Sequence, residues 1–316
     1  MSNFRFIDLC AGIGGLRIPF SQLGGDCVLT AEIDKAARET YTSYFGGRPE
    51  EIFGDLTKLR PGDVPKFDLL LAGFPCQPFS HAGKRKGFED TRGTIFFSIA
   101  SILEAQMPRA KVVLLENVRG LRNHDGGNTL ARILETLKQL GYVTHSTVLN
   151  ARDFGLPQNR QRLFIVGIRE DLDGAKDYTF PAPTHSRDAL TVQQILDANP
   201  SADLQISERL WRGHQARKVR NKEAGKGFGF QLVTPLSPYT ATLSARYYKD
   251  GSEILVRDAF DRPRLLSKKE AARLQGFPDE FEPHPSRAQA YKQFGNAVPV
   301  NVIRAIAGTL VHYLNY

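Results

Sequence analysis

The sequence predicts an α/β fold: a doubly wound, mostly parallel sheet, joined to a smaller domain of mainly β and loop structure. Two patterns lead to this prediction. In the first half of the chain, short apolar runs alternate with amphipathic stretches, an order typical of a parallel sheet covered by helices on both faces. The alternation stops near the Pro-Ala-Pro of residues 181–183, where segments rich in Gly, Arg and Tyr begin.

Each element follows from its own hydrophobic pattern. Buried strands are expected at residues 4–9, 28–31, 67–72, 111–116 and 163–168. Helices are expected at residues 16–23, 34–45, 94–107, 129–140 and 297–314. Weaker strand patterns lie at residues 240–244 and 254–257. We therefore expect residues 1–185 and 284–316 to form the larger domain and residues 186–283 the smaller one.

The composition bounds the class of protein. The chain has 316 residues, 41% hydrophobic and 24% charged, which suits a soluble globular enzyme with an ample core. Its net charge of +8 favours an anionic partner, although a mildly basic protein without one fits equally well. Three cysteines indicate no disulfide framework, and no apolar run reaches the roughly 18 residues of a membrane span. We expect a reducing, intracellular location.

A glycine-rich turn follows the first expected strand. Residues 8–15 read Asp-Leu-Cys-Ala-Gly-Ile-Gly-Gly, and their glycines let the backbone approach a ligand at the start of a helix. The second strand is followed by Glu32, a position where an acid commonly accepts hydrogen bonds from ribose hydroxyls. Asp55 offers a second acid, suited to an adenine amino group. Taken alone, the turn fits a dinucleotide site or a purely structural role.

A proline-flanked cysteine follows the third strand. Residues 73–80 read Gly-Phe-Pro-Cys-Gln-Pro-Phe-Ser, and the two prolines stiffen the loop around Cys76. A lone cysteine is more often a small buried hydrophobe than a nucleophile. A rigid loop with a polar rim is a poor place for a core residue, which favours a chemical role for Cys76. Cys10 and Cys27 lack such a setting and are expected to be structural.

Two further motifs place charge beside apolar strands. Glu116 ends an apolar run, where a carboxylate is costly unless it is paired or functional, and a structural ion pair is the simplest explanation. Gln158, Arg160 and Arg162 alternate ahead of Leu-Phe-Ile-Val, so on a strand they would share one face. Such a row could hold a phosphate and a base carbonyl, although a solvated edge strand is the alternative.

Together these motifs resemble the bacterial DNA (cytosine-5)-methyltransferases. The matching segments, in the family's order over nearly the whole chain, are residues 8–15, 73–80, 92–97, 116–118, 158–162, 265–281 and 294–300. Their spacing is close to that of the compact enzymes of restriction–modification systems. Two positions depart from the family pattern: Cys10 stands where Phe is usual, and Ile33 places an aliphatic side chain against the adenine.

The resemblance implies a Rossmann-like methyltransferase domain that uses S-adenosyl-L-methionine, and a smaller target-recognition domain. It implies that the Cys76 thiolate adds to C6 of a cytosine flipped out of duplex DNA, which activates C5. Glu116 would bind N3 and the exocyclic amine, Arg162 would hold O2, and Arg160 would position nearby groups.

The resemblance also assigns binding residues. Cofactor contacts are expected at Cys10, Gly12, Ile13, Gly14, Glu32, Ile33, Asp55, Leu56, Gly73, Pro75, Ile95, Asn296 and Val298. DNA contacts are expected at Gln158, Arg217, Lys218, Arg220, Lys226, Arg246, Tyr247 and Tyr248. The basic run at residues 209–226 would neutralise phosphates, with a solvated helix face as the alternative. Residues 227–230 and 242–255 are similar to enzymes whose sites open with CC and close with GG.

The expected partner is double-stranded DNA, bound by a monomer without metal or membrane, in the cytoplasm at the nucleoid. A cognate restriction endonuclease would act on the same site without a stable complex. A tRNA cytosine-5 methylase of the same fold is the nearest alternative, because it uses the same Pro-Cys loop. A DNA-binding regulator with an inactive fold and a nicotinamide-dependent oxidoreductase are further alternatives. Amino-methyltransferases are disfavoured because their Asp/Asn-Pro-Pro-aromatic loop is absent.

Overall fold

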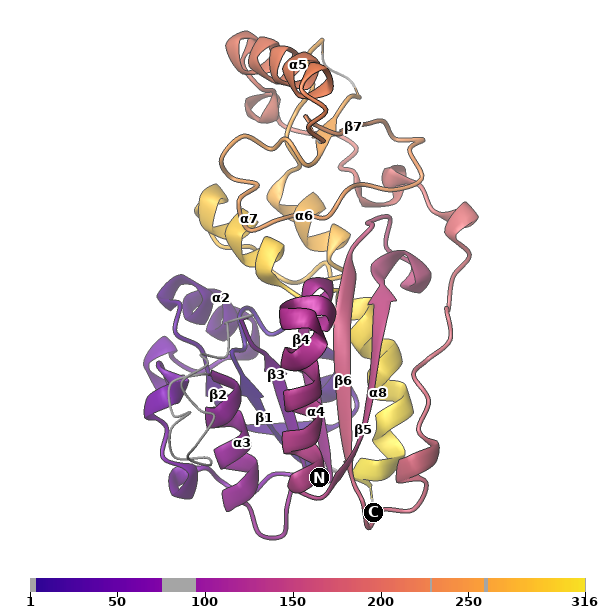
Figure 1. Cartoon of the computed structure of the whole chain (residues 1–316). Helices are drawn as coiled ribbons and strands as arrows, with labels where there is room; N and C mark the ends of the chain where they lie inside the picture. The colour runs from indigo at the N-terminus through magenta and orange to yellow at the C-terminus, as the bar shows by residue number, and fades with distance from the viewer. Residues whose placement is uncertain (1–3, 76–94, 228, 259–260, 316) are drawn as a thin grey trace. The chain divides into compact units, whose positions relative to one another are not determined.

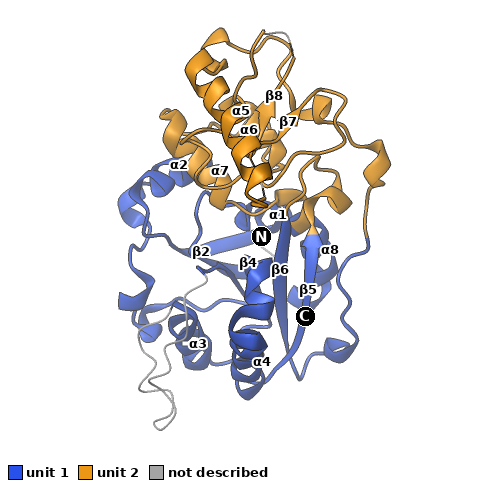
Figure 2. Ribbon diagram, turned by 45° about the horizontal axis from the view of Figure 1, so that its top comes forward, with its two compact units in different colours: residues 1–149, 161–182, 303–316 blue, residues 150–160, 183–302 orange. Residues whose placement is uncertain are grey.

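The computed structural model describes residues 4–75, 95–227, 229–258 and 261–315, which form two compact units (Figures 1 and 2). Unit 1 contains residues 1–149, 161–182 and 303–316, and unit 2 contains residues 150–160 and 183–302. This division differs from the expected domain boundaries, because residues 150–160, 183–185 and 284–302 group with unit 2. The side chains of Gln158 and Arg160 bond to unit 2 backbone, which accounts for part of the difference.

Unit 1 is built on a six-stranded sheet in the order β2-β1-β3-β4-β6-β5. The strands are β1 Phe4–Leu9, β2 Gly25–Ala31, β3 Leu69–Gly73, β4 Val112–Val118, β5 Tyr142–Asn150 and β6 Gln161–Arg169. Strand β1 pairs in parallel with β2 and β3, β3 pairs in parallel with β4, and β6 runs antiparallel to β4. The predicted mostly parallel α/β sheet is confirmed. The sequence analysis missed β5, whose central residues are polar and only partly buried, so they lack an apolar run.

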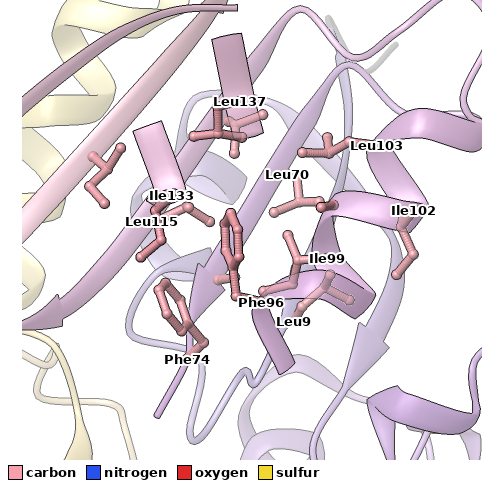
Figure 3. Packing of buried hydrophobic residues seen from close by; sticks show 14 of the residues in the cluster. Leu9, Leu70, Phe74, Phe96, Ile99, Ile102, Leu103, Leu115, Ile133 and Leu137 are labelled. Carbon is pink, nitrogen blue, oxygen red and sulfur yellow. The ribbon is translucent and has the colours of Figure 1, made fainter. Parts of the chain in front are cut away.

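Helices cover this sheet from both sides. They are α1 Arg17–Gln22, α2 Lys35–Phe45, α3 Ile95–Ala105, α4 Asn128–Gln139 and α8 Val300–Leu314, whose last twelve residues belong to unit 1. Figure 3 shows Phe96 of α3 and Ile133 of α4 among the apolar side chains of β1, β3 and β4. Both side chains are buried, as are Leu70 and Leu115 of the facing strands. Fixing the strands in this core also fixes where their ends lie.

The described part of unit 2 contains little sheet and several helices. Its helices are α5 Glu208–Glu223, α6 Lys268–Leu274 and α7 Arg287–Asn296, and its strands are β7 Leu232–Val233 and β8 Leu255–Val256, paired in parallel. The strand-like pattern at residues 254–257 is found as β8. The pattern at residues 240–244 yields one isolated bridge between Thr240 and Gln158, because the neighbouring polar groups bond to side chains and turns instead.

Short 3-10 helices connect these elements. They are η1 Pro49–Glu51, η2 Leu56–Lys58, η3 Pro61–Asp63, η6 Arg119–Gly127, η7 Ala151–Phe154, η8 Ala175–Asp177, η9 Arg187–Ala189, η10 Val192–Ile195 and η11 Ala202–Leu204.

Residues 287–314 are long and apolar enough to cross a membrane by length and composition, but their structure is that of two core helices. The stretch is interrupted at Ala297, whose backbone is extended between α7 and α8. In α8, Ile303, Ile306 and Leu310 are fully buried within the protein. A membrane span would instead present such side chains to lipid.

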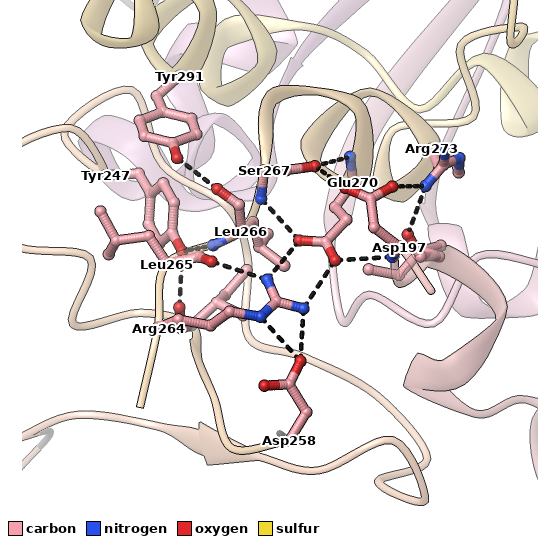
Figure 4. Close-up of polar contacts among 12 residues, drawn as sticks. Asp197, Tyr247, Asp258, Arg264, Leu265, Leu266, Ser267, Glu270, Arg273 and Tyr291 are labelled. Atoms are coloured by element: carbon pink, nitrogen blue, oxygen red, sulfur yellow. Dashed lines mark hydrogen bonds and ion pairs between the residues drawn. The ribbon is translucent and has the colours of Figure 1, made fainter. Parts of the chain in front are cut away.

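A buried ion pair organises unit 2 (Figure 4). The guanidinium of Arg264 binds both carboxylate oxygens of Glu270 at 2.7 and 2.8 Å, and both side chains are fully buried. Arg264 also contacts Asp258, at 2.6 Å. Glu270 accepts the backbone N–H of Ser267 in the capping box that begins α6, and the N–H of Asp197. The two buried charges therefore hold three separate chain segments together.

Removing one partner of this pair should strongly destabilise the protein. Arg264→Ala leaves the Glu270 carboxylate buried without its cation, so we expect the free energy of unfolding to fall by about 3–5 kcal/mol. Urea unfolding followed by circular dichroism measures this. The control is Arg212→Ala, which breaks an exposed pair with Glu208 and should cost less than about 1 kcal/mol. Equal, small losses in both variants would contradict the structural role of Arg264.

Candidate active site

The register of the parallel strands brings four predicted site residues to one edge of the sheet. One row of paired residues crosses these four strands: Ala31, Leu9, Ala72 and Leu115. One residue farther along each strand come Glu32, Cys10, Gly73 and Glu116. This is the carboxyl edge of the parallel strands, where ligands bind in open α/β sheets. The motifs scattered through the first half of the sequence therefore meet at one place.

The turn after β1 is tied to the turn after β2 by Glu32. The N–H of Gly12 donates to Glu32 Oε2 at 2.7 Å, and the N–H of Asp34 donates to Oε1 at 2.8 Å. Gly12 has a φ of +56°, and a Cβ built on it would meet no atom within 4 Å. The turn thus leaves open space beside a carboxylate that is held in place by backbone donors.

The residues around this carboxylate differ in what they can offer a ligand. Ile33 is 72% exposed, which leaves an apolar surface free beside Glu32. Asp55 begins η2 and accepts the N–H and hydroxyl of Thr57, and these hydrogen bonds lower its pKa. Leu56 and Ile13 are buried, so their side chains belong to the packed interior. Asp55 therefore has a structural capping role whether or not it also meets a ligand.

The other predicted cofactor positions are less closely grouped. Pro75 is exposed just after β3, and Ile95 is half-buried at the first residue of α3. Asn296 is exposed and Val298 is buried, both in unit 2, which is described separately from the turn in unit 1. The predicted nucleophile, Cys76, lies outside the described residues.

Glu116 forms an ion pair with Arg162 at the same edge. Arg162 Nε lies 3.1 Å from Glu116 Oε1, and the two side chains are only 14% and 10% exposed. The antiparallel ladder sets Arg162 opposite Val118, two residues beyond Glu116, so both side chains share one face of the sheet. Burial lowers the pKa of Arg162, and the Glu116 carboxylate opposes that shift. The pair is structural, and it also presents an acceptor and a donor side by side.

Gly73 and Asn117 shape the surroundings of Glu116. A Cβ on Gly73 would lie 3.5 Å from Glu116 Oε2, so a larger side chain there would crowd the carboxylate. Asn117 is buried, and its amide donates to the Phe74 carbonyl at 2.8 Å. It thereby holds the chain that leaves β3 just before Pro75. The sequence analysis did not name Asn117 as a site residue, although its place in the Glu-Asn-Val motif was a usable signal.

A buried acid lies beneath the glycine-rich turn. Asp8 is fully buried and accepts a hydrogen bond from the Tyr41 hydroxyl at 3.2 Å, while Tyr41 also bonds to Arg17 and Thr30. Burial raises the pKa of Asp8 to about 8. Burial, with Glu32 and Asp8 nearby, raises the pKa of the Cys10 thiol to about 12, so Cys10 stays protonated near neutral pH.

Gln158 and Arg160 do not share a strand face with Arg162, which corrects that expectation. Strand β6 begins at Gln161, because the N–H of Arg160 bonds to the Gln158 carbonyl in a tight turn. Both side chains are fully buried in unit 2. Gln158 bonds to the backbone of Leu274 and Leu243, each at 2.9 Å.

Arg160 is a brace between backbone segments of unit 2. Its guanidinium donates to the carbonyls of Leu243 and Gly295 at 2.9 Å and of Ala297 at 2.6 Å. These three bonds use the two terminal nitrogens of the guanidinium, each directed at backbone carbonyl oxygens. The structure therefore places Arg160 among backbone carbonyls of its own unit and Arg162 at the ion pair with Glu116.

The predicted DNA contacts of unit 2 divide by exposure. Those on the surface are Lys218, Arg220, Lys226, Arg246 and Tyr248. Arg217 is half-buried and bonds to Asp250 at 2.9 Å, which fixes α5 to the loop after it. Tyr247 is fully buried, with its hydroxyl bonded to the Ile254 carbonyl at 2.7 Å. A surface contact with DNA is therefore available to the first group and not to Tyr247 in this conformation.

Comparisons with known proteins give a full-length match. A family model described as C-5 cytosine-specific DNA methylase matches residues 4–312. The chain is 53% identical over 306 residues to the Type II methyltransferase M.NlaX of Neisseria lactamica, covering 96% of this chain and 95% of that protein. It is 50% identical over 313 residues to M.DsaV of Dactylococcopsis salina, covering 99% and 87%.

Solved structures share the fold at lower identity. The Dnmt2 methyltransferase of S. pombe has a TM-score of 0.78 at 20% identity, covering 99% of this chain and 100% of that chain. A DNMT2 mutant of Spodoptera frugiperda has a TM-score of 0.77 at 22% identity, covering 97% and 99%. A putative DNA modification methyltransferase encoded within a prophage of E. coli has a TM-score of 0.69 at 23% identity, covering 99% of each chain.

The raised pKa of Asp8 predicts a specific pH dependence of stability. Asp8 titrates near 8 in the folded protein and near 3.8 when unfolded, so its stabilisation is complete below about pH 4 and is lost as pH rises toward 8. Relative to the non-titrating Asp8→Asn variant, the wild type should lose up to about 1.4 kcal/mol per pH unit over this interval. Urea unfolding of both proteins from pH 4 to 8 measures this. Parallel stability curves would contradict the assignment.

Proposed function

The chain belongs to the C-5 cytosine-specific DNA methylase family, and on that premise we propose that it flips a cytosine out of a specific duplex sequence and methylates it through a covalent adduct with Cys76. It is a DNA (cytosine-5)-methyltransferase of the Type II restriction–modification kind and uses S-adenosylmethionine. The proposal concerns the mechanism, the residues and the target.

The observation that carries the proposal is the buried pair of Glu116 and Arg162 at the carboxyl edge of the sheet. The Watson–Crick edge of cytosine offers N3, an exocyclic amine and the O2 carbonyl. A carboxylate suits the amine and a protonated N3, and an adjacent guanidinium suits O2. Asn117, the neighbour of Glu116, binds the carbonyl of Phe74, which precedes Pro75 and Cys76 in the sequence. These residues support a site that reads cytosine and also activates it.

Cys76 supplies the nucleophile in this mechanism. C5 of cytosine is a weak nucleophile. The thiolate sulfur bonds to C6, and the electrons of the C5–C6 double bond shift so that C5 becomes part of an enamine. N3 takes a proton at the same time, supported by Glu116. C5 then forms a bond to the methyl carbon, the electrons of the broken S–C bond stay on the donor sulfur, and C5 loses its proton to a base. The freed electron pair restores the C5–C6 double bond, the S–C6 bond breaks with its electrons returning to sulfur, and N3 releases its proton.

The turns after β1 and β2 fit the methyl donor. S-adenosylmethionine supplies an electrophilic methyl group on a positively charged sulfur. The open space at Gly12 admits a ligand against the backbone, and the Glu32 carboxylate is held where ribose hydroxyls would donate to it. We assign the adenine to exposed Ile33 and its amino group to Asp55. The remaining assigned contacts are Cys10, Ile13, Gly14, Leu56, Gly73, Pro75, Ile95, Asn296 and Val298.

Recognition of DNA is assigned to unit 2. A base in a duplex cannot reach the Glu116–Arg162 pair, so the target must leave the stack at a cost of a few kcal/mol. The exposed basic residues of α5 would neutralise phosphates, and loops around residues 225–248 would read base edges. Arg217, Gln158, Arg160 and Tyr247 would support these loops from within, because their side chains bond to neighbouring segments.

The comparisons favour DNA over tRNA as the substrate. The Dnmt2 structures share less than 25% identity with the chain, so they bear on the fold alone. The relatives near 50% identity over the full length are Type II methyltransferases. We propose that the enzyme acts as a monomer and protects the sites of a cognate restriction endonuclease without a stable complex.

Loss of the thiol should abolish chemistry but spare binding. We expect Cys76→Ala to lose methyl transfer from S-adenosylmethionine to duplex DNA and to keep its DNA affinity within a few-fold. Wild type should form a denaturant-stable adduct with DNA containing 5-fluorocytosine, because the fluorine at C5 blocks the final elimination. Denaturing gels detect the adduct, and Cys27→Ala serves as the control that should still form it. Residual turnover by Cys76→Ala would overturn the assignment of the nucleophile.

The target class is testable in cells. Residues 227–230 and 242–255 lead us to propose sites that open with CC and close with GG. Bisulfite sequencing of plasmid DNA from a methylation-free host expressing the enzyme should show protected cytosines confined to such sites. Protection at sites with another core would reject the target class and leave the chemistry intact.

A further inference from the structure

We propose that Arg119 binds a backbone phosphate of the target strand beside the flipped cytosine. Arg119 is the first residue of η6, directly after β4, and its side chain is exposed. Its Nη1 donates to the side-chain oxygen of Gln161, the first residue of β6, at 2.7 Å. This side-chain bond places a cation at the edge where Glu116 and Arg162 meet.

The position of Arg119 follows from the ladder between β4 and β6. The last paired residues are Val118 and Arg162, and Arg119 and Gln161 come next on their two chains. Arg119 is therefore one residue beyond the pair that contains Arg162 and three residues beyond Glu116. No separate domain or mobile arm is needed to bring it to the site, because the same two strands position all four side chains.

Among the residues that the structure describes, the side chain bonded to Arg119 is that of Gln161, which carries no charge to neutralise the guanidinium. Glu116 neutralises Arg162, and Asp171 neutralises Arg169 at the other end of β6. Arg119 instead contacts the neutral amide oxygen of Gln161, which orients the guanidinium through one of its five N–H donors. The remaining donors keep the planar fork that suits two oxygens of a phosphate.

A phosphate fits this location better than a base edge. The base is assigned to the buried Glu116–Arg162 pair, so the sugar–phosphate backbone of the same nucleotide must lie nearer the solvent. Arg119 is exposed at that rim. Phosphate contacts fix register and orientation without reading sequence, so Arg119 would help hold the flipped nucleotide in place.

This inference rests on the proposed function, since it assumes a flipped cytosine at the Glu116–Arg162 pair. The test measures the affinity of Arg119→Ala for a cognate duplex over a range of salt concentrations, with single-turnover methylation of the same duplex. We expect the Kd to rise about 10-fold and the slope of log K against log salt to decrease in magnitude by about 0.9. Arg119→Lys should keep the slope, because the charge remains.

Matched variants separate this role from general charge and from structure. Arg122→Ala removes an exposed arginine from the same segment and should change the Kd by less than about 2-fold. Gln161→Glu should resemble Arg119→Ala, because a carboxylate would neutralise the guanidinium. Thermal unfolding should be unchanged in all four variants.

The outcomes are distinct. If wild type is active, the phosphate assignment is overturned by an unchanged salt slope in Arg119→Ala. It is also overturned if Arg122→Ala loses as much affinity for the duplex as Arg119→Ala does. A wild type that forms no 5-fluorocytosine adduct instead overturns the proposed covalent mechanism, whatever the slope of the Arg119 variant.

Discussion

The shared register of β2, β1, β3 and β4 is the constraint on which the arrangement of this edge depends. Paired parallel strands run in one direction, so the residues one position beyond the same paired row are brought to one edge of the sheet. Glu32, Cys10, Gly73 and Glu116 arrive there from positions more than 100 residues apart in the chain. A one-residue slip in any ladder would turn the corresponding side chain to the opposite face.

The antiparallel strand β6 adds the counter-charge to this edge. Burying Glu116 alone would be costly, and the guanidinium of Arg162 offsets that cost. At the other side of the edge, two backbone N–H groups donate to the Glu32 carboxylate and stabilise its charge. Both carboxylates are held before a ligand arrives, so little reorganisation is needed when one binds.

In unit 2 the buried arginines stabilise the structure, whereas the exposed cations contribute a positive surface charge. Arg264 is neutralised by Glu270 and Asp258, and Arg160 donates to three carbonyls; both side chains are fully buried, so neither is at the surface. The exposed lysines and arginines of α5 carry the positive field, while Arg217 anchors that helix to Asp250. Inner polar contacts thus set the shape of the unit, and outer charges provide long-range attraction to a polyanion.

The sequence by itself determined the mostly parallel sheet, the order of the helices and strands in unit 1, and the motifs at the strand ends, because apolar periodicity and special turn residues are local signals. It also identified the family, since several independent motifs occur in a fixed order. Only the tertiary structure decided what each polar side chain does. Arg160 and Arg162 are two residues apart and look alike in the sequence, yet a tight turn before β6 sends one to backbone carbonyls and the other to Glu116. Tyr247 and Tyr248 are adjacent, yet one is fully buried and the other 44% exposed. Such differences depend on which distant segments pack against a residue, and a local sequence pattern does not determine those neighbours.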